Sequence, residues 1–559
     1  MTFLTRIALL LSVLALAACA SSTNVETAAS VPVNASHVWV TVKGLWVATD
    51  AGTLPDDTTG WTQFTLATPV TIDLATLASG TLGQIASKLK IPAGTYRQMH
   101  LELADAADTL ASSASSANLS YNAQVSIADD AGTVTTAPLE LAVPEAGLTF
   151  PVDFTISKVL PGNLASASSS SGSTDSTSAS ASLNLTATAT LALDFDAARS
   201  LLAYAYGSNT GYLFNPVTTL DNEALAGAIS GSVDLSALAS SHAPVWVSAQ
   251  AADSAQTHHV IVRRVPVASD GSFVLYPLPA ASDGSTTYDV VISCAGADTV
   301  IVRGVPVSPG GVASATSLQT SAIALTAATT AYAALVAQSP ALPAGSRVDF
   351  YQTVAGSGEL PYLIASTELN PLTRLLPGSA LPLTQGAIQT ATYASGTDAT
   401  LVTAAPAEGN GSYLIGSEAP YFTDTRDSVG TGITGTAGEP TSITAPVPTL
   451  PAGAVSGTLT VTLSVTAGGY DSGFLTVTTG NRLVETADVS SLLQRGGGTL
   501  TLSGLPAGSA LVASGGVPYQ VAVRAWASSD AAGSLRKVAG TASVALGDGG
   551  TGNIDVVLD

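Results

Sequence analysis

Hydrophobic and polar residues alternate along several segments of the chain, which is the pattern of half-buried β-strands. Residues 150–156 and 183–195 alternate most regularly. A third segment follows the turn at residues 91–94, and successive side chains of a strand point to opposite faces. We expect one face to carry Arg97, Met99, Leu101 and Leu103, and the other to carry Tyr96, Gln98, His100 and Glu102.

Turns punctuate these strands. The triplet Pro-Ala-Gly occurs at residues 92–94, 343–345, 451–453 and 506–508. Residues 91–94 fit a type I turn, with Pro at its second position and Gly at its fourth. The triplet is therefore interpreted as a turn that starts a strand. Only residues 75–89 suggest a short helix.

Two segments lack the apolar residues that a core needs. Residues 19–33 are rich in Ser, Thr and Ala and predict a flexible tether. Residues 164–182 are nearly all Ser, Ala and Thr, and predict a disordered loop between paired strands.

An internal repeat occupies the later part of the chain. "GAISGSV" at 227–233 matches "GAVSGTL" at 453–459, and "YDVVI" at 288–292 matches "YQVAV" at 519–523. The spacing from Gly231 to Leu278 is close to that from Gly457 to Leu505. Two copies of one all-β module are expected.

The fold class follows from these patterns. We predict an all-β protein of tandem antiparallel β-sandwich domains, immunoglobulin-like or transthyretin-like, after a lipoprotein signal peptide. The expected divisions of the 559 residues are a signal peptide at 1–18, the tether at 19–33, and β domains at 34–220, 225–325, 326–447 and 448–559.

The N-terminus has the arrangement of a secretory signal. Arg6 precedes the apolar residues 7–16, a run too short to span a bilayer. "LAAC" at 16–19 resembles the lipobox of bacterial lipoproteins, which implies cleavage before Cys19 and acylation of Cys19. No Asp follows Cys19, which in such lipoproteins points to the outer membrane. The alternative is an ordinary signal peptide with an incidental cysteine.

The charge composition of the chain limits the kinds of partner that it can bind. Charged residues make up 10% of the chain against about 25% in an average protein. There are 18 basic and 40 acidic residues, for a net charge of −22, so the surface repels phosphate backbones and nucleic-acid binding is excluded. The acidic residues are scattered, which favours solubility over divalent-cation binding.

Few residues suggest chemistry, and we predict no catalytic residue, metal site or cofactor. Cys294 shares a strand face with Tyr288 and Ile292, so a buried structural thiol is expected. His258 and His259 are adjacent and would point to opposite strand faces, which disfavours a shared metal. Residues 547–555 only loosely match a calcium-binding glycine-aspartate repeat. Trp39, Trp46 and Trp61 favour core packing over a sugar-binding platform.

The first domain shows a family resemblance. "VWVTVKGLWV", "GWTQFTL", "TIDLATLASG", "IPAGTYRQMHLEL" and "ALDFDAARS", followed by "FNPVTTL", together resemble the bacterial lipoprotein family called domain of unknown function 4382, over residues 34–220. The resemblance implies no activity and no site residues. Residues 225–325 are similar to carboxypeptidase-regulatory or transthyretin-like sandwiches, which implies a spacer or binding domain.

The expected function is a non-enzymatic, membrane-anchored lipoprotein that presents binding or structural domains at the bacterial cell envelope. Its partners would be the membrane, through lipid on Cys19, and an unidentified carbohydrate or protein. The alternatives are a carbohydrate-active or other secreted hydrolase and a calcium-dependent adhesin. Two carboxylates about 5–10 Å apart in a cleft would support the hydrolase.

Overall fold

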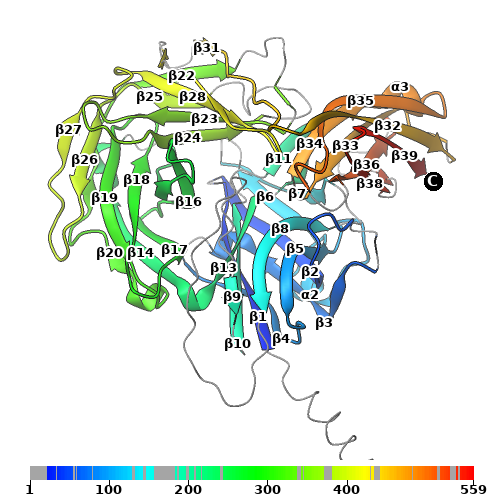
Figure 1. The fold of residues 1–559 in the computed structure, drawn as a ribbon, viewed down its shortest axis with the longest axis horizontal. Coiled ribbons are helices and arrows are strands. Elements are labelled where there is room, and N and C mark those ends of the chain that lie inside the picture. Colours follow the sequence, from blue (N-terminus) through cyan, green and yellow to red (C-terminus); the bar gives the residue numbers. More distant parts are fainter. Residues whose placement is uncertain are drawn as a thin grey trace, which may run out of the picture.

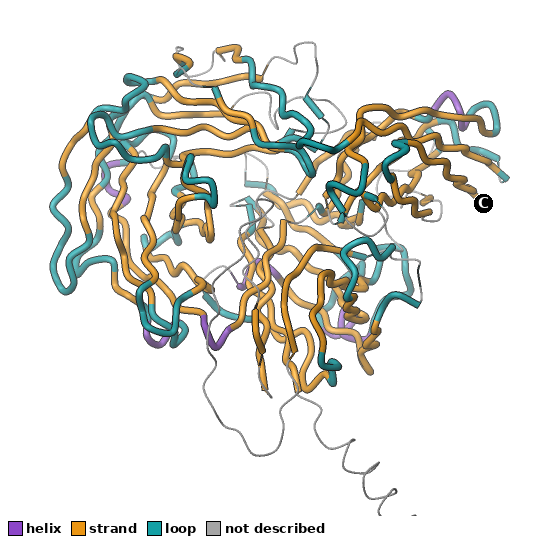
Figure 2. Tube along the Cα trace, in the orientation of Figure 1, coloured by secondary structure: helices purple, strands orange, loops and turns teal. Residues whose placement is uncertain are grey.

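The computed structural model describes the chain from residue 22 onward, apart from short gaps. These gaps are residues 33, 55–56, 58, 78–79, 129–131, 143–146, 157–182, 186–187, 197–200, 207–208, 216, 239–242, 336–341, 344, 370–380, 428–429, 434–440, 467, 481, 513–515, 529–536 and 539–541. The expected loop at 164–182 lies outside the described residues. Strands dominate the described chain, which confirms the all-β class (Figure 2).

Four β-sandwiches, which we call modules 1 to 4, follow one another along the chain (Figure 1). Module 1 contains β1 (Ser22–Ser30), β2 (Ala35–Ala48), β3 (Thr62–Asp73), β4 (Gly83–Leu89), β5 (Gly94–Leu103), β6 (Gln124–Ala128), β7 (Val134–Leu141), β8 (Leu148–Ile156), β9 (Leu183–Leu185), β10 (Thr188–Asp196), β11 (Leu201–Tyr206), β12 (Asn209–Phe214) and β13 (Val217–Asn222). Its short helical turns are η1 (Leu74–Leu77) and α2 (Ser112–Ser116).

Modules 2 and 3 are interleaved along the chain, because two strands that lie between module 3 strands in sequence join a sheet of module 2. Module 2 contains η4 (Glu223–Leu225), β14 (Ala226–Asp234), η5 (Leu235–Ala237), β15 (Trp246–Ala252), β16 (His259–Pro266), β17 (Ser272–Pro279), β18 (Thr286–Ser293), β19 (Thr299–Val307), η6 (Val312–Ser314), β20 (Thr316–Ser317) and β21 (Ile323–Ala324). Module 3 contains β22 (Thr330–Leu335), β23 (Arg347–Gln352), β24 (Tyr362–Glu368), β25 (Leu381–Thr384), β28 (Ser412–Glu418), β29 (Thr425–Arg426), β30 (Thr431–Gly432) and β31 (Thr441–Ile443). Between β25 and β28 the chain returns to module 2, where β26 (Ile388–Thr392) pairs with β19 and carries β27 (Val402–Ala404).

Module 4 completes the chain. It contains β32 (Val455–Val465), β33 (Ser472–Thr479), β34 (Arg482–Asp488), α3 (Ser490–Leu493), β35 (Gly497–Ala507), β36 (Val517–Trp526), β37 (Lys537–Val538), β38 (Ala542–Leu546) and β39 (Thr551–Leu558). Along β32 the apolar residues Leu459, Val461 and Leu463 point into the core while the threonines between them are partly exposed. This alternation is the physical basis of a sandwich strand.

All four modules share one strand plan, whereas the sequence predicted two copies. In the first sheet, β1, β14, β22 and β32 pair antiparallel with β4, β17, β25 and β35, and parallel with β10, β20, β31 and β39. In the second sheet, β2, β15, β23 and β33 lie between β3, β16, β24 and β34 on one side and β5, β18, β28 and β36 on the other. Module 1 adds β6, β7, β9, β11, β12 and β13 to this plan.

A tyrosine at the second or third position of the same strand marks each copy. Its hydroxyl donates a hydrogen bond to a backbone carbonyl at or just after the end of the preceding first-sheet strand, which ties the two sheets together. The pairs are Tyr96 with Pro92 (2.8 Å), Tyr288 with Pro279 (2.6 Å), Tyr413 with Thr384 (2.8 Å) and Tyr519 with Pro506 (2.7 Å). Two of the Pro-Ala-Gly triplets lie at this corner. The triplet at 92–94 leads into β5 as predicted, whereas the triplet at 506–508 ends β35, so the expectation that it starts a strand is wrong there.

The expected tether at 19–33 is wrong from residue 22 onward. Residues Ser22–Ser30 form β1, an inner strand of its sheet, with Val25 and Ala29 buried in the core of module 1. The segment looks polar because its threonines alternate with small apolar residues. Thr23 and Thr27 are nevertheless buried, since strands pair with β1 on both sides. Module 1 therefore begins earlier than residue 34.

The four modules close into a ring through polar contacts at each junction (Figure 1). Arg263 of β16 pairs with Asp194 of β10 and donates to the Ala29 carbonyl (3.2 Å), which joins modules 2 and 1. The Gln250 amide exchanges hydrogen bonds with the backbone of Leu363 (2.7 and 3.1 Å), which joins modules 2 and 3.

Module 4 closes the ring on both sides. Arg482 of β34 contacts Glu368 of module 3 at 3.2 Å. Arg524 of β36 is fully buried against module 1, where its Nε lies 2.9 Å from Glu140 and its Nη1 donates to the Ala142 carbonyl at 3.0 Å. Tyr204 donates to the same glutamate at 2.8 Å. Module 4 thus packs on module 1 through a hydrogen-bonded buried ion pair.

Candidate functional site

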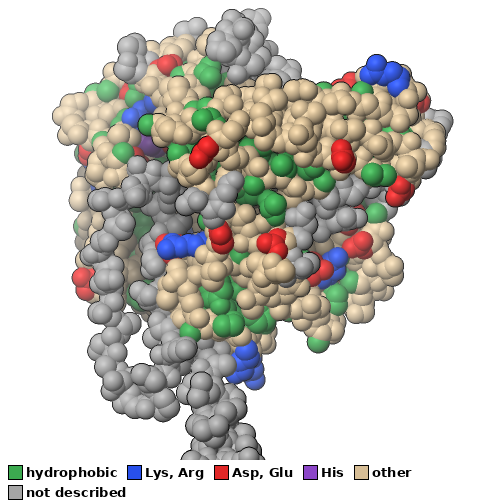
Figure 3. Space-filling model, turned by 45° about the vertical axis from the view of Figure 1, so that its right-hand side comes forward, with side chains coloured by type: hydrophobic (Ala, Val, Ile, Leu, Met, Phe, Trp, Pro, Cys, Tyr) green, Lys and Arg blue, Asp and Glu red, His purple; other side chains and the backbone are tan. Residues whose placement is uncertain are grey.

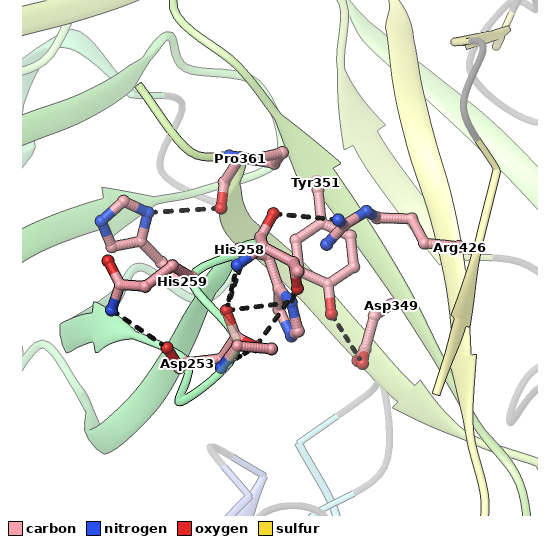
Figure 4. A network of polar contacts seen from close by, with 10 residues as sticks. Asp253, His258, His259, Asp349, Tyr351, Pro361 and Arg426 are labelled. Atoms are coloured by element: carbon pink, nitrogen blue, oxygen red, sulfur yellow. Dashed lines mark hydrogen bonds and ion pairs between the residues drawn. The ribbon is translucent and has the colours of Figure 1, made fainter. Parts of the chain in front are cut away.

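A charged pocket of about 330 Å³ lies where module 2 meets module 3 (Figure 4). Strand β23 supplies Asp349 and Tyr351, and the end of β28 supplies Glu418. Asp424 and Arg426 line another side, and the loop that precedes β16 adds His258. The site therefore exists only when the two modules are assembled.

One guanidinium holds two of the pocket's carboxylates. Arg347 Nε lies 2.8 Å from Asp349 Oδ1, and its Nη2 lies 2.7 Å from Asp349 Oδ2. The same Nη2 pairs with Glu418, which also contacts Arg482 at 3.5 Å. The Tyr351 hydroxyl donates to Asp349 at 3.3 Å, and burial, followed by the charge of Asp349, raises the pKa of Tyr351.

Two acids of this pocket have raised pKa values. Burial, followed by the charge of Glu418, raises the pKa of Asp424 to about 7, and burial also raises the pKa of Asp427. Burial, followed by the charge of Arg426, lowers the pKa of His258. His258 is therefore neutral at pH 7, because its ordinary pKa already lies below 7.

The loop before β16 is held in place by Asp253. Its carboxylate accepts hydrogen bonds from the backbone amides of Thr257 (2.5 Å) and His258 (2.9 Å), as Figure 4 shows. His258 then packs edge-on against Tyr351, with ring centroids 5.3 Å apart. Arg426 donates to the Thr257 carbonyl at 2.9 Å from the module 3 side.

This arrangement can exchange one proton near pH 7 and admit a small polar molecule. Acid–base hydrolysis needs one carboxylate as acid and a second one free as base or nucleophile. Here Asp349 and Glu418 share Arg347, so their lone pairs are engaged. Among the described residues, no group of three or more His, Cys, Asp or Glu side chains is arranged to hold a metal ion.

His258 and His259, which were predicted to point to opposite strand faces, contact two different aromatic rings. His259 stacks on Tyr362 with ring centroids 4.1 Å apart, and its Nε2 lies 3.5 Å from Asp289. His258 contacts Tyr351 instead. Both rings therefore hold module 2 against module 3.

The tryptophans of module 1 pack against a histidine. The ring of His100 lies 4.4 Å from that of Trp46 and 5.8 Å from that of Trp61, centroid to centroid. His100 is buried, its Nδ1 lies 2.7 Å from Thr149 Oγ1, and burial lowers its pKa to about 3. Trp61 is buried, whereas Trp39 and Trp46 are only partly buried, and none of the three belongs to the hydrophobic core of module 1. The core packing predicted for all three therefore holds only for the burial of Trp61.

Two other features singled out in the sequence, Cys294 and residues 547–555, make contacts within the fold. Cys294 is a buried free thiol, and burial raises its pKa to about 11. In the 547–555 segment, the Asp548 carboxylate accepts the backbone amide of Ser509 at 2.6 Å. Cys19 lies outside the described residues. No helix in the described part of the chain is long and apolar enough to cross a bilayer.

The sequence analysis missed the acids of the pocket. One signal was available, because residues 418–427 hold Glu418, Asp424, Arg426 and Asp427 in a chain with only 10% charged residues. Asp349 and Arg347 carried no such signal, since they stand alone in a strand. The pocket needs residues from two modules, which no local pattern reveals.

Comparison with solved structures gives weak likenesses to bacterial surface proteins. A mutant form of the shaft pilin SpaA of Lactobacillus rhamnosus GG is 13% identical, with 42% of this chain and 98% of that chain covered, at a TM-score of 0.18. A streptococcal ancillary pilin is 8% identical over 77% of this chain and 99% of that one, at 0.13. A tetra-tandem repeat of a large adhesion protein is 12% identical over 94% and 100%, at 0.11. Likenesses this low carry no argument about function.

Sequence comparison reaches only the first module. No curated protein matches the chain. A family model does match, from within β1 to just after β12, and it leaves modules 2 to 4 uncovered. Residues 27–216, about a third of the chain, match the family described as Domain of unknown function (DUF4382).

Proposed function

We propose that this protein is a non-enzymatic lipoprotein of the bacterial cell envelope, anchored through acylated Cys19, that presents a ring of four β-sandwich modules as a binding or structural scaffold. The outer membrane is its expected location. Residues 27–216 match a family of unknown function, and this match points to no enzyme family.

The ring closure carries this proposal. Buried Arg263 and Arg524 each join one module to another, and their carboxylate partners are also buried. Breaking a buried ion pair by removing one partner costs roughly 3–5 kcal/mol, so these junctions resist opening. Several of the few basic residues of this chain therefore lie at junctions between modules. This placement suits a scaffold, whose modules must stay together.

The hydrolase alternative would have to use the pocket between modules 2 and 3, where carboxylates gather. Two of its acids, Asp349 and Glu418, are held by Arg347, which disfavours that use. Assaying the wild-type protein and the Asp424→Asn variant on a panel of polysaccharides and peptides tests it. Turnover that the variant loses would overturn the non-enzymatic proposal.

The chain offers a matched control for the anchor, because it has two cysteines. Cells fed a clickable palmitate analogue should label the wild type and the Cys294→Ala variant, and should not label Cys19→Ala. Labelling of Cys19→Ala, or none of the wild type, would refute the anchor. Protease shaving of intact cells then separates surface display, where the protein is lost, from a periplasmic face, where it is protected.

A further inference from the structure

The anchor and the fold lie unusually close together in the chain. Strand β1 begins at Ser22, three positions after Cys19. A fully extended chain spans at most about 3.5 Å per residue, so the Cα of Cys19 lies within roughly 11 Å of that of Ser22 whatever path it takes. Acyl chains on Cys19 would hold this end of module 1 at the membrane surface, with no room for a long tether.

Two lysines lie beside the start of β1. Thr23 pairs with Leu89 at the end of β4, so Lys88 and Lys90 flank that pairing, and both are exposed. They are two of the five lysines in the chain. Figure 1 shows β1, β4 and β10 reaching the lower tip of the ring, opposite β22, β25 and β31. We call the surface of Lys88, Lys90 and the turn at 92–94 the basic tip.

The backbone of the basic tip is held in an uncommon conformation. Lys88 has a φ of 55°, in the left-handed region that few non-glycine residues adopt. The Asn24 side chain accepts the Lys88 backbone amide at 2.9 Å, next to the register shift between β1 and β4. A strained residue persists only where its surroundings hold it, and such residues gather at functional sites.

The basic tip differs in charge from the rest of the chain, whose net charge is −22. The nearest acids along β1 and its neighbours are Glu26 and Asp221, which both pair with Ala192 in one row. Lys88 contacts Asn24, and Glu26 lies two residues further along β1, about 7 Å at the rise of a strand. The two lysines therefore form a small positive site that Glu26 borders on one side. Figure 3 shows basic side chains alone at the lower end of the molecule.

We propose that the basic tip docks onto anionic phospholipid headgroups, so that the ring stands with module 1 on the membrane and module 3 facing away. This inference rests on the proposed acylation of Cys19. The acyl chains supply the membrane affinity. The lysines supply the orientation, since each basic residue near an anionic surface is worth about a fivefold preference, or roughly thirtyfold for two.

The test measures orientation of the acylated full-length mature protein on vesicles. A fluorophore is attached at Ala93→Cys in the exposed turn, or at Gly468→Cys in module 4, in a Cys294→Ala background. The vesicles contain phosphatidylglycerol and a headgroup quencher. We expect strong quenching at position 93, little at 468, and loss of the difference in phosphatidylcholine vesicles.

Charge variants decide the role of the lysines. Lys88→Asn/Lys90→Gln removes two charges, and asparagine tolerates the left-handed backbone. Arg495→Glu changes the net charge equally on the exposed surface of module 4. The double variant should lower the preference for the docked orientation about thirtyfold, seen as lost quenching at 93, while Arg495→Glu should leave it unchanged.

Equal quenching at 93 and 468, or quenching at 93 that survives the double variant, would overturn the inference. Mass spectrometry of the same sample reports acylation of Cys19 independently. Unacylated Cys19 would refute the proposed anchor itself, whereas acylated protein without oriented docking refutes only the basic tip. Melting curves of the double variant that match the wild type exclude misfolding as the cause.

Discussion

His100 makes module 1 sensitive to acid. Its ring packs beside the rings of Trp46 and Trp61, it is 1% exposed, and burial lowers its pKa to about 3 from the ordinary 6.5. The unfolded chain therefore takes up a proton at His100 long before the folded protein does. Stability is fully present above pH 6.5 and falls as the pH drops toward 3.

The magnitude follows from the pKa difference. Each pH unit between 6.5 and 3 removes about 1.4 kcal/mol, so at pH 4.5 this one side chain lowers the free energy of unfolding by roughly 3 kcal/mol. The total loss below pH 3 is roughly 5 kcal/mol. That is comparable to the whole stability of a marginal domain.

The perturbation is His100→Phe, which keeps an aromatic ring beside the tryptophans and removes the titration. Urea unfolding followed by tryptophan fluorescence, from pH 7 to 4.5, should show a smaller pH dependence in the variant by about 3 kcal/mol. Thr149→Val is the matched control, because it removes the hydrogen bond to Nδ1 and keeps the titrating ring. It should lower stability by about 1 kcal/mol at every pH and retain the wild-type slope.

Two results would refute this reasoning. Equal pH dependence in the wild type and His100→Phe would mean that the ring is not held neutral by burial. A flat profile in Thr149→Val would mean that the hydrogen bond, not burial, sets the protonation. Differences between variants isolate His100 from the other titrating groups of the chain.

Three other contacts yield predictions. Arg524→Met removes the guanidinium that compensates the charge of buried Glu140, so it should destabilise by roughly 3–5 kcal/mol and raise the radius of gyration in small-angle scattering. Arg524→Met/Glu140→Leu should recover much of the stability, and no recovery would contradict the ion-pair account. Tyr519→Phe leaves the Pro506 carbonyl without its donor and should cost about 1 kcal/mol in urea unfolding, whereas an unchanged midpoint would dismiss the corner bond. Asp424 has a raised pKa, so its contribution to the stability of the folded protein is present at low pH and is lost as the pH rises toward 7. The melting temperature of the Asp424→Asn variant should lack this loss. Identical pH dependence of the melting temperature in the variant and the wild type would contradict the prediction.

Local pattern predicted a strand after the turn at 92–94 but not which way all of its side chains point. Strict alternation places the side chains of Tyr96 and Met99 on different faces of the strand, yet both are buried in the core of module 1. The cause is a bulge between Tyr96 and Gln98 in the pairing of β5 with β8. A bulge adds one residue to one strand and reverses the facing beyond it.

The same effect governs the tryptophans of β2. In an unbroken strand Trp39 and Trp46, seven residues apart, would face opposite sides. A register shift between Val42 and Gly44 puts both tryptophans on the same face of the sheet. The residues directly before and after each tryptophan point into the core and are buried. Trp46 can then stack on His100 outside the core. Bulges depend on the partner strand, so a single strand's sequence does not reveal them.

The sequence by itself determined the all-β class, the alternating strands, the turns and the recurrence of one module, because these depend on neighbouring residues and on backbone preferences. Only the tertiary structure decided that β1 is a buried strand, that four modules share one plan, and that they close into a ring. Those features depend on partners hundreds of residues away, such as Glu140 for Arg524. An isolated arginine or a threonine-rich segment looks exposed until the chain that buries it is in place.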